Sequence, residues 1–274
     1  MTTHPAYLDY PWELYDLDYE GFEADIHLYR SLLREGNYRI LELASGTGRI
    51  LIPLARDGHH VCGLELVDGM LQVTRAKVAP EAPEVRDRIE LVSGDMRSFE
   101  LNQSFDCVLL PLKTCLHLRT DREYRATLER VRAHLKPGGL FLLDAFRPDS
   151  TCFKRFNGKW VRRYDRIRPG TGERVQRSQR VIHDGARRLL RGRHRWEISG
   201  PAGAIGDEPR VRALDLIQHY LAPEELRSML QATGFSVETL WGDYRRSAPD
   251  CPVRIDPHYP SWVQSTAFFI CRAT

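Results

Sequence analysis

The sequence lacks any apolar run near the roughly 18 residues that a helix needs to cross a bilayer. Its first residues, MTTHPAYLDYPWE, contain no basic stretch followed by an apolar one, so no secretory signal is predicted. The expected location is therefore cytoplasmic, without membrane contact. With 42% hydrophobic and 28% charged residues, the 274-residue chain has the composition of an ordinary globular protein.

Paired cysteine spacings are also missing. The six cysteines are scattered, at Cys62, Cys107, Cys115, Cys152, Cys251 and Cys271. This pattern indicates neither a disulfide framework nor a zinc knuckle, so no metal site is predicted.

A strong overall charge is absent too, because the net charge is only +3. It is unevenly distributed, however: residues 151–220 hold 17 Lys/Arg against 7 Asp/Glu, a net of +10. Such a segment suits an anionic substrate or a nucleic acid. The alternative, that the arginines cover the solvent face of a small sheet, is equally open. A nucleic-acid partner is disfavoured because the arginines are spread across apparent hairpins rather than gathered with aromatic residues.

The most informative stretch is RILELASGTGR, residues 39–49. An apolar run with one acidic residue enters a Gly-rich turn, and residues 50–58 then have the pattern of a helix. Glycines allow the backbone to approach a ligand closely, and the start of a helix offers unpaired N–H groups. Alone this signal is weak, since ordinary tight turns have the same composition.

Two further expected strands end in acidic residues. Residues 61–65 form an apolar strand that ends at Glu65, about 20 residues after the Gly-rich turn, where a doubly wound sheet places the acid that binds a ribose diol. Residues 89–92 form a third strand, followed by Asp95 and Met96. The carboxyl ends of parallel strands meet at one edge, so these side chains are expected to converge on one pocket.

These segments together resemble the class I S-adenosylmethionine-dependent methyltransferases. The resemblance is carried by ELASGTG (42–48), GLELVDGML (63–71), SGDM (93–96), FDCVLL (105–110) and LKPGGLFLLD (135–144). It implies an α/β fold, with a Rossmann-like seven-stranded methyltransferase sheet that has helices on both faces. The fifth strand is expected at residues 140–143, and residues 235–240 and 265–271 are expected to form the antiparallel edge of this sheet.

The resemblance also implies that S-adenosylmethionine is the cofactor. The residues expected to bind it are Tyr15, Tyr19, Glu42, Ala44, Gly46, Gly48, Glu65, Leu66, Met70, Asp95, Met96 and Leu110. Two of them depart from the family pattern. Ala44 stands where the family has its first glycine, and Glu65 stands where many members have aspartate; neither change excludes binding.

Two residues are candidates for a catalytic role. His117 follows the fourth strand, where a transferase meets its acceptor, and imidazole is suited to take a proton near neutral pH. The alternative is a hydrogen-bonding residue at the start of a helix. In the family, a tyrosine of a Tyr-Asp-x-x-Tyr pattern closes over the cofactor, which here points to Tyr15 in YDLDY. An aromatic ring beside a sulfonium attracts the cation and excludes water. Alternatively, these rings only pack the N-terminal helix onto the sheet.

Three regions are expected along the chain. Residues 1–36 form an N-terminal helical lid, and residues 37–149 and 221–274 form the methyltransferase core. Residues 150–220 form an antiparallel β insertion after the fifth strand, with short segments at 159–167, 175–183, 189–198 and 211–220. Such an insertion either covers the ligand edge as a substrate roof or provides the surface of a homodimer. Trp160, Tyr164, Arg180, His194, Trp196 and His219 are its candidate lining residues.

The predicted function is transfer of a methyl group to nitrogen or oxygen of a small-molecule acceptor by in-line displacement. Positioning dominates this chemistry, which explains the absence of an obvious acid–base motif. The resemblance extends to N-methyltransferases of amino sugars and glycine. Two other readings are an RNA-directed methyltransferase and a non-catalytic S-adenosylmethionine-binding or assembly module. A nicotinamide-dependent oxidoreductase is disfavoured, because the loop lacks G-x-G-x-x-G spacing.

Overall fold

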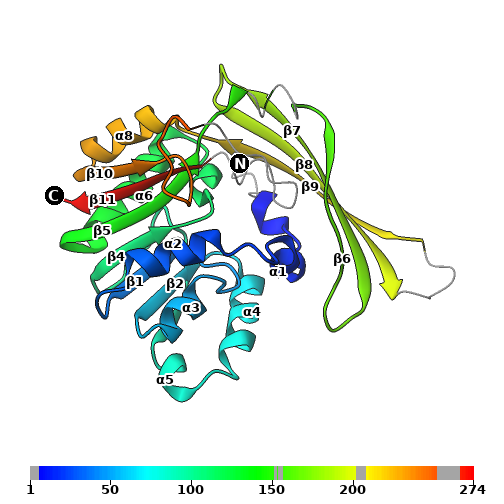
Figure 1. The fold of residues 1–274 in the computed structure, drawn as a ribbon, viewed down its shortest axis with the longest axis horizontal. Coiled ribbons are helices and arrows are strands. Elements are labelled where there is room, and N and C mark those ends of the chain that lie inside the picture. The colour runs from blue at the N-terminus through cyan, green and yellow to red at the C-terminus, as the bar shows by residue number, and fades with distance from the viewer. Residues whose placement is uncertain (1–5, 151–152, 154–156, 202–207, 252–265) are drawn as a thin grey trace.

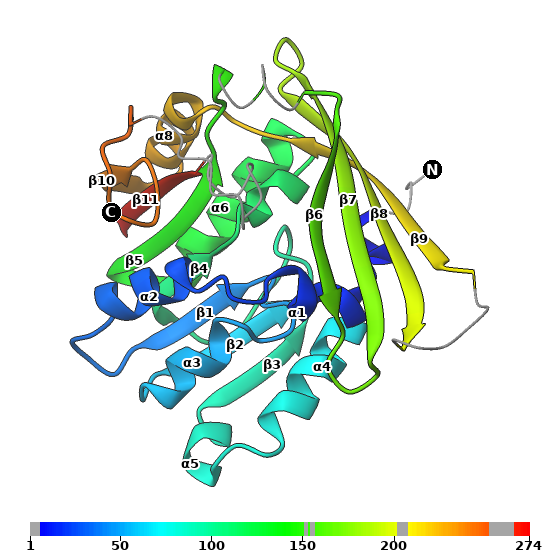
Figure 2. The same cartoon turned by 45° about the vertical axis from the view of Figure 1, so that its right-hand side comes forward.

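The computed structural model describes residues 6–150, 153, 157–201, 208–251 and 266–274. Two sheets lie next to each other, and the N-terminal segment runs between them (Figures 1 and 2). Within the described residues the larger sheet has seven strands, in the order β10-β11-β5-β4-β1-β2-β3. Their bounds are β1 Arg39–Leu43, β2 His60–Glu65, β3 Ile89–Ser93, β4 Phe105–Leu110, β5 Leu135–Phe146, β10 Phe235–Trp241 and β11 Thr266–Ala273.

The first five strands along the chain, β1 to β5, are parallel to one another. β1 pairs with both β2 and β4, β2 pairs with β3, and β4 pairs with β5. The chain therefore moves outward in one direction from β1 to β3 and in the other from β4 to β5. A crevice at the carboxyl ends of β1 and β4 follows from this reversal, which is where open α/β sheets bind ligands.

Alternate residues of the central strands face opposite sides of this sheet. Leu41, Val108 and Leu110 pack in one apolar cluster, while Ile40 and Cys107 pack in the other. Helices α6 (Asp121–His134) and α8 (Pro223–Ala232) cover the first side, and α2 (Ala24–Leu32), α3 (Leu51–Arg56) and α5 (Pro83–Arg86) contribute to the second. The expected sheet with helices on both faces is thus confirmed. No helix in the described ranges is long and apolar enough to cross a membrane.

The far edge of the sheet is antiparallel, as the sequence predicted: β11 runs antiparallel to both β5 and β10. Residue 265, the first position of the predicted last strand, lies outside the described residues. The predicted fifth strand was too short, because β5 begins at Leu135 rather than at residue 140. Leu135 already pairs with Phe105, and a register shift accommodates the glycines that follow.

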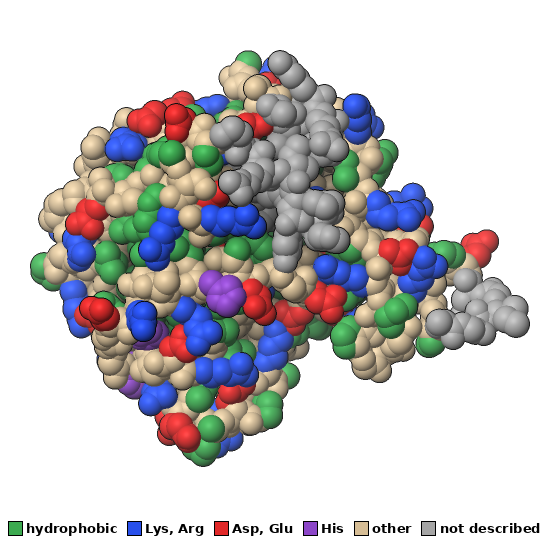
Figure 3. Space-filling view, in the orientation of Figure 1, with side chains coloured by type: hydrophobic (Ala, Val, Ile, Leu, Met, Phe, Trp, Pro, Cys, Tyr) green, Lys and Arg blue, Asp and Glu red, His purple; other side chains and the backbone are tan. Residues whose placement is uncertain are grey.

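The insertion is a four-stranded antiparallel meander, as expected. It contains β6 (Trp160–Ile167), β7 (Glu173–Asp184), β8 (Leu189–Pro201) and β9 (Arg210–His219), paired in that order. Many of its arginines form ion pairs within the sheet, including Arg174 with Asp165 and Arg193 with Asp215. Blue and red side chains both occur over this region (Figure 3). The positive charge of the segment is therefore partly balanced in place.

The N-terminal segment packs against the inner face of this meander. It contains the short helices η1 (Ala6–Asp9), η2 (Trp12–Leu14) and α1 (Tyr15–Asp18), and α2 follows it in the chain. Helix α4 (Asp68–Val78) comes later, between β2 and β3. Leu14 and Leu17 join Trp196 and its strand neighbours in one buried cluster. Residues 1–5 of the predicted lid lie outside the described residues.

Asp18 joins this segment to the meander. Its carboxylate, with 0% of the side chain exposed, pairs with the Arg177 guanidinium at 2.8 Å. It also accepts hydrogen bonds from the Tyr164 hydroxyl at 2.5 Å, from Trp196 Nε1 at 3.3 Å and from the Tyr10 hydroxyl. A buried carboxylate is tolerated only when its lone pairs are satisfied in this way. One residue of the segment thus binds three strands of the meander.

Replacing Asp18 with alanine is expected to destabilise the protein. The substitution leaves the buried Arg177 unpaired, and breaking one side of a buried pair costs about 3–5 kcal/mol. The free energy of unfolding from chemical denaturation measures this loss. Asp215→Ala is the matched control, since its pair with Arg193 is exposed and its loss should leave the free energy nearly unchanged. Equal effects of the two substitutions would contradict the role given to Asp18.

Candidate active site

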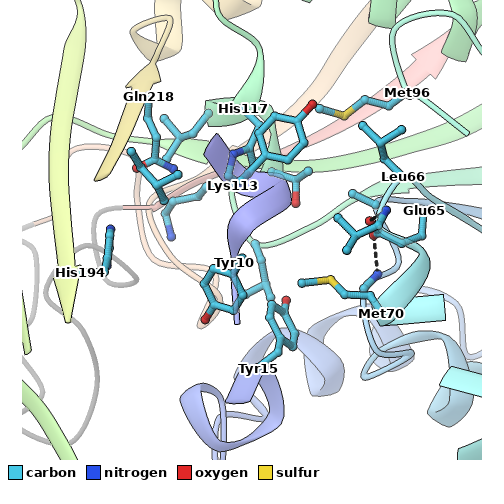
Figure 4. Close-up of a pocket in the computed structure, with 18 of the residues that line it drawn as sticks. Tyr10, Tyr15, Glu65, Leu66, Met70, Met96, Lys113, His117, His194 and Gln218 are labelled. Atoms are coloured by element: carbon cyan, nitrogen blue, oxygen red, sulfur yellow. Dashed lines mark hydrogen bonds between the residues drawn. The ribbon is translucent and has the colours of Figure 1, made fainter. Parts of the chain in front are cut away.

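A pocket lies between the carboxyl ends of the core strands, the N-terminal segment and the inner face of the meander (Figure 4). The core contributes its lower wall, the N-terminal tyrosines one side, and β7, β8 and β9 its roof. The residues that line the pocket are Tyr7, Tyr10, Tyr15, Tyr19, Ala44, Gly46, Glu65, Leu66, Val67, Met70, Gly94, Asp95, Met96, Arg97, Leu112, Lys113, Thr114, Leu116, His117, Phe146, Arg177, Val181, Leu190, His194, Leu216 and Gln218.

Glu65 ends β2 and holds the Gly-rich turn in place. Its Oε2 accepts the Gly46 N–H at 2.9 Å and its Oε1 accepts the Val67 N–H at 2.8 Å. Burial raises the pKa of this carboxyl, while the backbone hydrogen bonds oppose the increase. Each carboxylate oxygen has a second lone pair, so the group can still accept hydrogen bonds from two hydroxyl groups of a ligand.

Of the four residues predicted to bind the cofactor at the end of β1 and in the Gly-rich turn, two line the pocket and two do not. Ala44 and Gly46 line the pocket, at φ 51° and 59° respectively. Ala44 is therefore in the left-handed region at the position where the family has glycine, a conformation that costs alanine about 1–2 kcal/mol. Gly48 does not line the pocket; a Cβ there would meet Thr74 at 2.8 Å, so helix packing requires the glycine. Glu42 is 2% exposed and does not belong to the lining of the pocket.

An ion pair between Asp95 and Arg97, which was not predicted from the sequence, follows the end of β3. Asp95 and Met96 both line the pocket as predicted, but the Asp95 carboxylate accepts from Arg97 Nε at 2.9 Å. Burial raises the pKa of Asp95, but the hydrogen bonds from Arg97 outweigh it and leave the pKa below its ordinary value. Met96 therefore presents apolar surface next to a fixed charge. Leu110, by contrast, lies within the core and does not line the pocket.

Aromatic rings from the N-terminal segment close one side of the pocket. The Tyr15 and Tyr19 ring centroids are 4.8 Å apart, and those of Tyr10 and Tyr15 are 5.9 Å apart. A Cβ on Gly46 would be 3.7 Å from the Tyr15 ring, so this ring lies directly over the turn. Burial raises the pKa of Tyr15 well above its ordinary value. Its hydroxyl is therefore neutral and cannot act as a base near neutral pH.

Polar contacts fasten the same segment to the turn. Asp16 accepts from the Thr47 hydroxyl at 2.7 Å and pairs with Lys77 of α4 at 2.6 Å. Arg49 pairs with the buried Asp25 of α2 and lies 5.5 Å from the Tyr19 ring centroid. Since Asp18 binds the meander on the other side, the segment contacts both walls of the pocket.

His117 and Lys113 lie at the end of β4. Burial lowers the pKa of His117 to about 4, and its ring meets Tyr7 edge-on at 5.1 Å. Lys113 is 1% exposed; burial lowers its pKa to about 8, while Asp144 acts in the opposite direction. The backbone N–H of Lys113 donates to Asp144 at 2.8 Å, which stabilises its left-handed conformation. Because its pKa is about 4, the His117 imidazole is uncharged at neutral pH and can accept a hydrogen bond.

The roof of the pocket was only partly foreseen. Of the six candidates from the insertion, His194 alone lines the pocket. Trp160 is 49% exposed on the outer face, and Trp196 is buried against Asp18. The residues that do line the roof are Arg177, Val181, Leu190, His194, Leu216 and Gln218. Successive side chains of a strand point to opposite faces, and these six residues share one face of the meander. The sequence pattern could therefore have grouped them, but it does not show which face of the meander points inward.

The residues present fit an adenosyl sulfonium. Glu65 offers two acceptor oxygens for a diol, Leu66, Met70 and Met96 form an apolar surface for a flat base, and the tyrosine rings suit a cation. Glu65 itself is 5% exposed, so hydroxyls that bind it leave water. No group of three or more potential metal ligands occurs among the described residues.

Comparison with known proteins identifies the core. The family described as "Methyltransferase domain" matches residues 40–139, which include β1 to β4 and the start of β5. The curated relatives above 30% identity are aligned over only 41% to 51% of their own length. One of them is the dTDP-3-amino-3,6-dideoxy-alpha-D-glucopyranose N,N-dimethyltransferase of Streptomyces fradiae, 34% identical over 48% of this chain and 51% of that protein.

Other matches extend over most of the chain. The dTDP-3-amino-3,4,6-trideoxy-alpha-D-glucopyranose N,N-dimethyltransferase of Streptomyces venezuelae is 27% identical over 84% of this chain and 92% of its own. The structure of the CcbJ methyltransferase from Streptomyces caelestis covers 98% of both chains with a TM-score of 0.75 and 22% identity, a likeness of fold. The motifs, the sheet order and these matches agree. Residues 40–139 thus belong to the methyltransferase domain family, and the chain has the fold of the S-adenosylmethionine-dependent methyltransferases, whose cofactor is S-adenosylmethionine.

Proposed function

We propose that this enzyme methylates the amino nitrogen of a small sugar carried on a nucleotide. Two relatives whose printed names describe such substrates support this acceptor class, one of them along most of its length. The matches do not favour an RNA-directed enzyme or a non-catalytic module. The observation that carries the proposal is the continuity of the pocket, whose lining runs from Glu65 at the core strands to His194 and Gln218 on the roof.

The continuity matters because methyl transfer needs two ligands in one enclosed space. S-adenosylmethionine, when bound, supplies a methyl group on a positively charged sulfur. In this proposal Glu65 binds the ribose hydroxyls, and Met70 and Met96 contact the base. Tyr15 and Tyr19 cover this half of the pocket and exclude water, which keeps the reacting groups in a low-dielectric space. Residues 1–36 then serve as the lid, residues 37–149 and 221–274 as the core, and residues 150–220 as the roof over the acceptor.

His117 is proposed to orient the acceptor amine. Since burial lowers its pKa to about 4, its ring is neutral at physiological pH and can accept a hydrogen bond from an amine N–H. That hydrogen bond leaves the nitrogen lone pair free to face the methyl group. Tyr15, whose hydroxyl stays protonated, can donate a hydrogen bond but cannot remove a proton. Positioning of this kind contributes more here than proton transfer.

Methylation of sugar nucleotides by the purified protein tests the acceptor class. The two probes are dTDP-3-amino-3,6-dideoxy-alpha-D-glucopyranose and dTDP-3-amino-3,4,6-trideoxy-alpha-D-glucopyranose, the sugars in the relatives' names. We expect at least one to gain one or two methyl groups, seen by mass spectrometry together with S-adenosylhomocysteine. An analogue with hydroxyl in place of the amine is the control and should not react. If only the hydroxyl analogue is methylated, the enzyme transfers the methyl group to oxygen rather than to nitrogen. If neither amine reacts, the proposed acceptor class is wrong.

Replacing Glu65 should weaken cofactor binding. Glu65→Gln keeps the size of the side chain but removes the charge, and hydrogen bonds to charged groups contribute about 1.5–3 kcal/mol each. The dissociation constant for S-adenosylmethionine, measured by calorimetry, should rise about tenfold or more. Glu90→Ala, on an exposed position of β3, is the control and should bind as the wild type does. Unchanged affinity in Glu65→Gln would contradict the ribose assignment.

The pH dependence of the reaction tests the state of His117. Its imidazole is uncharged well above its pKa of about 4, so its protonation should cause no loss of kcat/KM as pH falls from 8 to about 5.5. His117→Asn should lower kcat by about 100-fold through misplacement of the acceptor, yet leave the shape of the profile above pH 5.5 unchanged. A wild-type acid limb near pH 6.5 that disappears in the variant would show that His117 is a titrating base instead.

A further inference from the structure

His194 belongs to the lining of the pocket, and one of its ring nitrogens meets no protein group among the described residues. The residue lies on β8, on the face of the meander that forms the roof, and only 7% of it is exposed. Its Nε2 has no hydrogen-bond partner within the described part of the chain. Figure 4 shows the ring on the opposite side of the pocket from Glu65 and Met70, beyond the half assigned to the cofactor.

Arg177 determines which ring nitrogen carries the proton. The Arg177 Nη2 lies 3.3 Å from His194 Nδ1, and a guanidinium can only donate. Nδ1 must therefore accept, and the proton of the neutral ring is on Nε2. Arg177 is fixed in turn by its pair with Asp18. Burial and the positive charges of Arg177 and Arg163 lower the pKa of His194 to about 3, so the ring stays neutral. The free nitrogen is thus an N–H donor.

A glycine makes room for this orientation of the ring. Gly192 lies two residues before His194 on the same face, and a Cβ there would be 2.8 Å from Nε2. The Gly192 backbone is not left-handed, so local conformation does not require glycine. A glycine inside a strand weakens it and often marks a close approach to a ligand. Its neighbours across the strands are Val181 and Leu216, both of which line the pocket.

The N–H therefore lies beside Gly192, in a part of the pocket lining where the neighbouring side chains are apolar. A buried donor without an acceptor is unfavourable, and Val181 and Leu216 cannot accept a hydrogen bond. We infer that His194 is a specificity-determining residue, whose Nε2–H donates to an oxygen of the acceptor molecule. This inference rests on the proposed function, since the oxygen belongs to the molecule that receives the methyl group. A site of this type selects acceptors that bear the oxygen, which an apolar pocket cannot do.

The test compares kcat/KM for the sugar nucleotide that the wild-type enzyme methylates best. His194→Phe keeps a ring of similar shape but removes the donor, which leaves the acceptor's oxygen unpaired. We expect kcat/KM to fall roughly 5- to 100-fold, mainly through a higher KM. His194→Gln, which retains an N–H donor, should recover part of this loss. Affinity for S-adenosylmethionine should stay unchanged in both variants.

A matched control separates this role from a structural one. His219 is also 7% exposed on the meander and has a ring nitrogen without a partner, but it does not line the pocket. His219→Phe should leave kcat/KM unchanged. If His194→Phe also keeps the wild-type kcat/KM, or loses cofactor affinity as well, the inference is wrong while the proposed function stands. If the wild-type enzyme methylates neither sugar, the proposed function fails and this inference fails with it.

Discussion

The pair between Asp18 and Arg177 is the contact on which the arrangement of the pocket depends. It is buried, and it joins the N-terminal segment to the inner face of the meander. The same segment is held to the Gly-rich turn through Asp16 and Arg49. The meander also meets the core directly, through the pairs of Arg188 with Asp121 and Glu225 and through Leu190, which packs in one cluster with Leu116 and Phe146. The buried charges thus position the roof relative to the cofactor half of the pocket.

The second constraint is the convergence of strand ends at one edge of the parallel sheet. Glu65 ends β2, Asp95 follows β3, and His117 follows β4, yet all three line one pocket. Parallel pairing brings these ends together because every strand points the same way. A chain segment of more than 50 residues separates Glu65 from His117, so only the sheet makes them neighbours.

Burial then sets the charge state of the groups in this pocket. It holds His117 and His194 neutral and keeps the Tyr15 hydroxyl protonated. Several charges of the lining have fixed partners: Asp95 is paired with Arg97, Arg177 with Asp18, and Glu65 accepts two backbone N–H groups. A space with few free charges favours an uncharged amine as the nucleophile and leaves the sulfonium as the principal charge of the reaction. Positioning within a dry pocket is the mode of catalysis that such a site supports.

The core strands and the meander could be predicted from the sequence, because they depend on local signals: apolar runs, a Gly-rich turn, acids at strand ends and alternation within residues 150–220. The cofactor followed from the resemblance of the motifs to a known family. The sequence also selected Tyr15, Glu65, Met70 and His117, all of which line the pocket. It did not determine which face of the meander is inward, since period-2 alternation is the same for either face. Nor did it show the partners of Asp18, or the pairing of Arg177 with His194, because these groups are far apart in the chain. Only the tertiary structure brings them together, and with them the roof of the site.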